Sequence, residues 1–180
     1  MQKGAAMLKR LIILVVLLAG ALVVGQAQDK PAREIYTALS YGDSVFEPES
    51  WLASATDQVG VTTAQWRADL LNGLAYLSYL HFDTPVQPDQ ISLIFTDDWF
   101  KATFANYQSV QEVTNCQLND VTLHEFSLLQ NNEKFSLRYW IKPISENRVL
   151  TMFLVFPSSS TKLLDDYAKK LFPDATVCAG

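Results

Sequence analysis

Apolar and polar side chains alternate most clearly in the last third of the chain. Over residues 134–143 every second position is apolar, which predicts a strand with one face in the core, although Trp140 breaks the pattern. Residues 120–130 and 148–156 flank this segment, and short Asn- and Ser-containing turns separate the three. We therefore expect a three-stranded antiparallel meander. Its third strand is apolar on both sides, which predicts a central position in the sheet.

Helical spacing of apolar residues marks the segments before and after this meander. In residues 63–82 apolar side chains recur every three or four positions, and Thr62 and Gln65 match a capping box, so we expect one long helix there. The other predicted elements are strands over residues 35–41 and 91–95, and helices over 48–57, after Thr96, and from Ser159 or Ser160 to Pro173.

Strands in series with helices on either side predict the fold class. We expect a single α+β domain over residues 35–180, in which an antiparallel sheet packs with several α-helices. The length of 180 residues favours one domain. The strand–turn–strand–turn–strand–helix ending over about residues 120–172 resembles the ending of Mog1/PsbP-type sandwiches. This resemblance lies in the order of elements and in no specific motif.

The first 27 residues have the pattern of a secretory signal peptide. Basic residues precede an apolar run from Leu11 to Gly25, and Gly25 and Ala27 supply small side chains at the −3 and −1 positions. An uncleaved membrane anchor is the alternative, but the run would span about 22 Å of a hydrocarbon core of roughly 30 Å. We expect cleavage after Ala27, a loose tail over residues 28–34, and a secreted or periplasmic protein.

The amino-acid composition and the net charge limit the classes of partner that we expect. Hydrophobic residues make up 49% of the chain and charged residues 18%, which excludes intrinsic disorder. After removal of the leader, 11 basic and 19 acidic residues remain, a net charge of −8. Such an acidic chain argues against nucleic acid or an anionic membrane surface as a partner, and membrane contact is expected only with an uncleaved leader.

Two cysteines, Cys116 and Cys178, lie in the predicted mature chain. An even number in an exported protein predicts a disulfide. Their separation of 62 positions matches neither a redox C-x-x-C motif nor a zinc site. We expect a structural disulfide and neither a metal nor a cofactor.

Catalytic motifs are incomplete in this sequence. Gly42-Asp43-Ser44 resembles the nucleophile block of GDSL-type esterases, which would make Ser44 a nucleophile. That family pairs Asp and His as D-x-x-H, but Val121 stands three positions before His124, so an ordinary turn is the preferred interpretation. The strand pattern also sends His124 and Glu125 to opposite faces, so we expect His124 to make a local hydrogen bond rather than a catalytic pair with Glu125.

The remaining candidates are aromatic side chains that periodicity places poorly in a core. If several shared an exposed concave patch, they would bind sugars, peptides or lipids, although core packing is the preferred interpretation. They are Trp51, Tyr76, Tyr79, Trp99 and Trp140. The function predicted is a non-enzymatic binding or accessory domain, whose partner is an extracytoplasmic protein or a small ligand. The alternatives are a GDSL-like hydrolase that uses Ser44 and a structural envelope protein.

Overall fold

The computed structural model describes residues 52–58, 61–171 and 177–178. The predicted leader (1–27), tail (28–34) and first strand (35–41) lie outside this part of the chain, as do Ser44 and Trp51. In the described part, no helix is both long enough and apolar enough to cross a bilayer.

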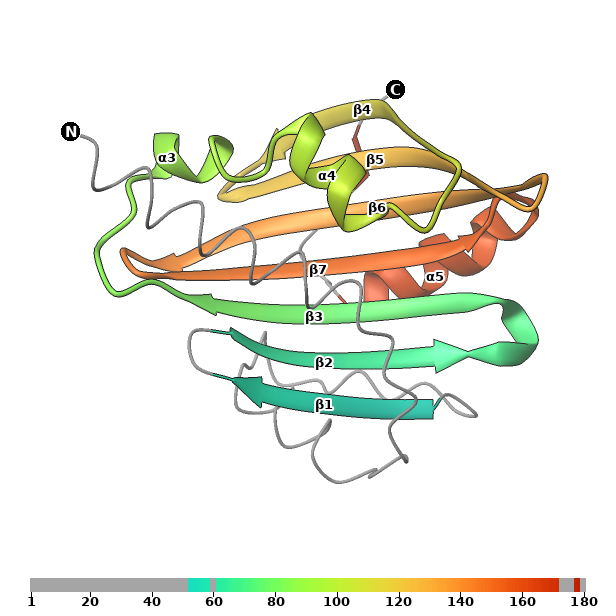
Figure 1. Cartoon of the computed structure of the whole chain (residues 1–180), viewed down its shortest axis with the longest axis horizontal. Helices are drawn as coiled ribbons and strands as arrows, with labels where there is room; N and C mark the ends of the chain where they lie inside the picture. Colours follow the sequence, from blue (N-terminus) through green and yellow to red (C-terminus); the bar gives the residue numbers. More distant parts are fainter. Residues whose placement is uncertain (1–51, 59–60, 172–176, 179–180) are drawn as a thin grey trace.

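A seven-stranded antiparallel sheet dominates the described structure (Figure 1). Its strands are β1 (Leu52–Gln58), β2 (Val61–Ala68), β3 (Gly73–His81), β4 (Ser109–Leu118), β5 (Val121–Gln130), β6 (Glu133–Ser145) and β7 (Arg148–Pro157). The spatial order is β1-β2-β3-β7-β6-β5-β4. β7 therefore lies between β3 and β6 and joins the half formed by β1, β2 and β3 to the half formed by β4, β5 and β6.

The predicted fold class is wrong, because the sheet is far larger than a three-stranded meander and the helices are short. The main error concerns residues 63–82, which form β2, a 3₁₀ turn (Asp69–Leu71) and β3 instead of one helix. Asn72 reverses the chain with a φ of 50°. β-branched and aromatic residues on both sides of this turn favour strands, and the pairing of β3 with β7 outweighs the helical spacing.

Two further predictions of local structure are wrong. Leu52–Asp57 belongs to β1, so the helix expected over 48–57 does not extend through these residues. The strand expected at 91–95 is preceded and overlapped by helix α3 (Pro88–Ser92). Pro88 occupies its first turn, and Gln87 and Gln90 form a reciprocal capping box that favours helix over strand.

The C-terminal predictions agree better with the structure. β5, β6 and β7 follow one another in antiparallel register, and Asn131 and Asn132 form the β5–β6 turn with positive φ angles. Helix α4 (Asp97–Thr103) begins after Thr96, whose hydroxyl accepts a hydrogen bond from the Trp99 amide. Helix α5 (Thr161–Leu171) follows a 3₁₀ turn at Ser158–Ser160.

Helices cover the two faces of the sheet, with α3 and α4 on one side and α5 on the other (Figure 1). β7 is buried on both faces, as its apolar sequence predicts. On the α5 face, the Arg138 side chain is 9% exposed and lies 2.7 Å from Asp165 of α5 and 3.5 Å from Glu125 of β5. These ion pairs join the helix to two strands.

The predicted disulfide is confirmed. Cys116 of β4 and Cys178 near the C-terminus are bonded, with Cα atoms 5.7 Å apart. The bond holds Cys178 against the edge strand β4 of the described sheet. Because structural disulfides persist in oxidising compartments, it indicates an extracytoplasmic location.

Candidate functional site

A bulge in β4 places two polar side chains on the same face of the sheet. The register of β4 on β5 shifts between Glu112 and Thr114, so Glu112 lies opposite Phe126 and Asn115 opposite His124. Without the bulge, residues 112 and 115 would point to opposite faces. The extra residue, Val113, is exposed, and the shift brings Glu112 and Asn115 together beside His124.

His124 is held from both sides. Its Nδ1 lies 2.7 Å from Glu112 Oε1, which also accepts a hydrogen bond from the Asn115 amide at 3.2 Å. The Phe100 ring of α4 contacts the imidazole, with centroids 4.9 Å apart. The expected local hydrogen bond of His124 is therefore present, while Glu125 points to the other face and pairs with Arg138.

A pocket of about 330 Å³ lies beside this histidine, between the end of α3 and the strands β4, β5 and β6. We call it the α3 pocket. One part of its wall is apolar and another part is polar. The lining residues are Ile91, Ser92, Phe95, Gln117, Asp120, Thr122, His124, Ile141 and Pro143.

Each polar side chain of the α3 pocket already has a partner within the protein. Thr122 Oγ1 donates to Gln117 Oε1 at 2.9 Å, and Gln117 Nε2 donates to the Asn119 carbonyl at 3.0 Å. Ser92 Oγ donates to the Asp89 carbonyl at 2.8 Å. Asp120 lies 3.6 Å from Lys142 Nζ and stays largely exposed. The wall is thus organised before any ligand arrives.

This geometry offers little for nucleophilic catalysis. Glu112 orients His124 as a carboxylate orients a general base. The two hydroxyls that line the α3 pocket, on Ser92 and Thr122, have given their hydrogens to other acceptors. In the described residues, no group of three or more His, Cys, Asp or Glu side chains is placed to hold a metal ion.

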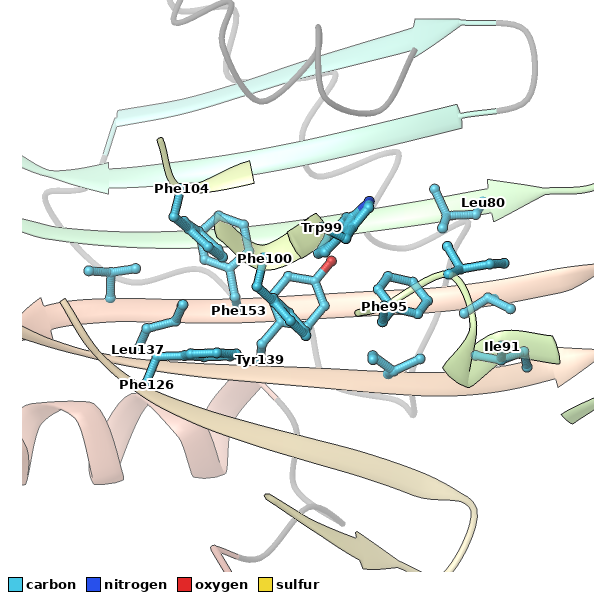
Figure 2. Close-up of a cluster of buried hydrophobic side chains, with 14 of the residues drawn as sticks. Leu80, Ile91, Phe95, Trp99, Phe100, Phe104, Phe126, Leu137, Tyr139 and Phe153 are labelled. Carbon is cyan, nitrogen blue, oxygen red and sulfur yellow. The ribbon is translucent and has the colours of Figure 1, made fainter. Parts of the chain in front are cut away.

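A cluster of buried aromatic rings anchors α4 to the sheet (Figure 2). Phe100 and Trp99 meet the Tyr139 ring edge-on, at centroid distances of 5.2 and 5.7 Å, and Phe104 meets Phe153 at 5.4 Å. Burial raises the pKa of Tyr139, and a hydrogen bond with Thr151 opposes part of that rise. Tyr139 is therefore a neutral core residue at physiological pH.

The aromatic residues singled out from the sequence do not share one surface. Trp99 and Trp140 are buried, at 5% and 1% exposure, on opposite faces of the sheet. Tyr76 and Tyr79 are half-buried. Tyr76 packs on the face that α3 and α4 cover, and Tyr79 packs on the α5 face. A role of these residues in binding stays a prediction. The residues that line the α3 pocket were missed, with His124 the exception, because an expected strand at 91–95 concealed α3 and no sequence signal marks the bulge.

Comparisons with known proteins assign neither a family nor a function. No protein-family model matches the chain, and no curated protein matches it. The chain is similar to the crystal structure of LpqN, involved in cell envelope biogenesis of Mycobacterium tuberculosis. The identity is 14% and the TM-score 0.42, over 71% of this chain and 84% of that one. It is also similar to the protein CV1439 from Chromobacterium violaceum, at 10% identity and a TM-score of 0.23, over 79% of this chain and 88% of that one.

Proposed function

We propose that this protein is a non-enzymatic, extracytoplasmic binding domain that holds a small ligand in the α3 pocket. The observation that carries the proposal is the pocket itself, whose volume of about 330 Å³ lies within the range of small-molecule sites, roughly 300–1,000 Å³. Its mixed wall supports the same interpretation. Apolar side chains supply contact area, and a few fixed polar groups supply orientation.

Three features support a binding role over a catalytic one. The hydroxyls at the pocket donate elsewhere, the His124–Glu112 pair has no activated nucleophile among its hydrogen-bond partners in the described structure, and the wall is prearranged. The disulfide supports an oxidising compartment, and a cleaved leader over residues 1–27 would deliver the protein to the periplasm or the exterior.

Thermal unfolding tests the proposal directly. The mature chain, with its disulfide intact, is melted against a panel of sugars, cell-wall fragments, lipids and small organic ions. A ligand that binds the native state alone raises the midpoint by mass action. We expect at least one class to raise it in wild type but not in Ser92→Trp, since Ser92 is an exposed residue on the pocket wall and an indole there fills the cavity.

Ala102→Trp is the matched control, because Ala102 is an exposed residue of α4 away from the pocket lining. It should retain the ligand-induced rise. A rise that survives Ser92→Trp would place binding elsewhere and contradict the proposal. A panel without any effect would also contradict it and would favour a structural envelope role that acts through protein partners.

A further inference from the structure

We infer that the α3 pocket selects a small organic cation, namely a primary ammonium group carried on a short apolar chain. This inference rests on the proposed binding function and specifies its ligand chemistry. It follows from the donors and acceptors that the wall leaves uncommitted.

In its neutral form His124 presents an acceptor rather than a donor. An ionised carboxylate only accepts hydrogen bonds, so the 2.7 Å contact with Glu112 requires His124 Nδ1 to carry the hydrogen. In the neutral imidazole the other nitrogen, Nε2, then has a free lone pair. The β4 bulge, which brings Glu112 to this face, therefore sets the tautomer of a residue that lines the pocket.

The two hydroxyls at the pocket present acceptors for the same reason. Ser92 Oγ gives its hydrogen to the Asp89 carbonyl, and Thr122 Oγ1 gives its hydrogen to Gln117 Oε1. Each hydroxyl oxygen keeps lone pairs that no other contact of the described residues uses. Against these acceptors, the side chains of the wall keep one uncommitted donor hydrogen, on the Gln117 amide.

The charged side chains near the pocket also favour a cation. Asp120 contributes a carboxylate to the pocket, and Glu112 places a second one directly behind His124. Among the described residues that line the pocket, none is lysine or arginine. Lys142 lies 3.6 Å from Asp120 and neutralises part of its charge. The site therefore disfavours an anion, and its free acceptors favour a neutral or cationic ligand that donates hydrogen bonds.

The apolar side chains of the pocket fit the hydrocarbon part of the proposed ligand. Ile91, Phe95, Ile141 and Pro143 line the same pocket and would cover a short hydrocarbon chain. An ammonium group supplies three donor hydrogens and one positive charge, which fits a wall that offers free acceptors and the carboxylate of Asp120. A carboxylate or phosphate of the same size would meet the carboxylate of Asp120 and few donors.

Three matched probes separate this inference from the wider proposal: hexylammonium, hexan-1-ol and hexanoate. They share a six-carbon chain and differ in head group. Binding is followed by changes in the ¹H–¹⁵N amide chemical shifts at about pH 8, where an alkylamine is protonated. We expect hexylammonium to bind about tenfold more tightly than hexanoate, with hexanol between them, and its shifts to centre on residues 117–124 and 141.

Asp120→Asn should weaken hexylammonium about fivefold, the effect of a partly exposed ion pair, and leave hexanol unchanged. Asp166→Asn is the matched control, because Asp166 is an exposed carboxylate on α5, the helix of the opposite face. It should change neither affinity. Equal or tighter binding of hexanol or hexanoate at the pocket would overturn the cation preference and leave the binding function standing. This inference would also be overturned if hexylammonium binding survived both Asp120→Asn and Ser92→Trp, or if no probe bound. The thermal-unfolding panel tests the proposed function independently of these probes.

Discussion

Replacing both cysteines of the Cys116–Cys178 disulfide with alanine should destabilise the protein by about 4 kcal/mol. The bond closes a loop of 62 positions, and the chain-entropy relation gives about that value for a loop of this length at 25 °C. Both cysteines also pack against the core on the α5 face, so the loss of their sulfur contacts adds to the effect. The midpoint of thermal unfolding should fall by about 8–16 °C, at about 2–4 °C per kcal/mol for a domain of this size.

Urea unfolding measures this difference by linear extrapolation. The slope of the free energy against urea should increase in the double variant, since an unfolded chain without the crosslink exposes more surface. Wild type treated with a reductant serves as a control and should approach the variant. A loss below about 1 kcal/mol with an unchanged slope would refute the reasoning, because the loop closure then would not constrain the unfolded chain.

The α3 pocket should survive the loss of the disulfide in the folded state. The register of β4 on β5, and with it the contact of Glu112 with His124, is set by backbone pairing over most of the strand. Amide shifts of residues 112–124 should therefore change little, except next to residue 116, under conditions where the variant stays folded.

Three further variants test other parts of the structure. Gly73→Ala should cost about 1–3 kcal/mol in urea unfolding, because its Cβ would lie 2.6 Å from the buried Phe156 ring; an unaffected stability would contradict this packing. Asp165→Asn removes the carboxylate nearest to the buried Arg138 guanidinium and should cost about 1–3 kcal/mol; a stability equal to wild type would show that the ion pair contributes nothing. Burial raises the pKa of Tyr139 above the value of about 10 that a tyrosine has in the unfolded chain. The contribution of Tyr139 to the free energy of unfolding is therefore complete below a pH of about 10, and it is lost as the pH rises through the pKa of the folded state. Tyr139→Phe should flatten the alkaline fall of stability, and a curve parallel to wild type above pH of about 10 would argue against this assignment.

The sequence predicts local structure well where one period dominates. Residues 134–143 alternate, with Trp140 as the exception, and lie in β6, and the apolar run in 148–156 forms the doubly buried β7. Thr96 and the two acidic residues after it fix the start of α4. In each case, the local signals agree on one element.

Residues 63–82 show why the rest could not be predicted. Their apolar side chains fit a helical stripe and also fit two strands, and the choice depends on the pairing of β3 with a strand about 70 positions away. The turn at Asn72 and the close approach of Gly73 to Phe156 belong to the folded sheet rather than to the local sequence. The site was hidden for a similar reason, since the relation of Glu112 to His124 depends on one extra residue in β4.

The bulge at Val113 also has a consequence for solubility. β4 is an edge of the described sheet, and a regular edge strand offers unpaired backbone groups to which another chain can add. One extra residue twists the strand and interrupts that template at its middle. Deletion of Val113 would therefore restore a continuous edge and favour intermolecular strand pairing. The irregularity that orients His124 also opposes aggregation.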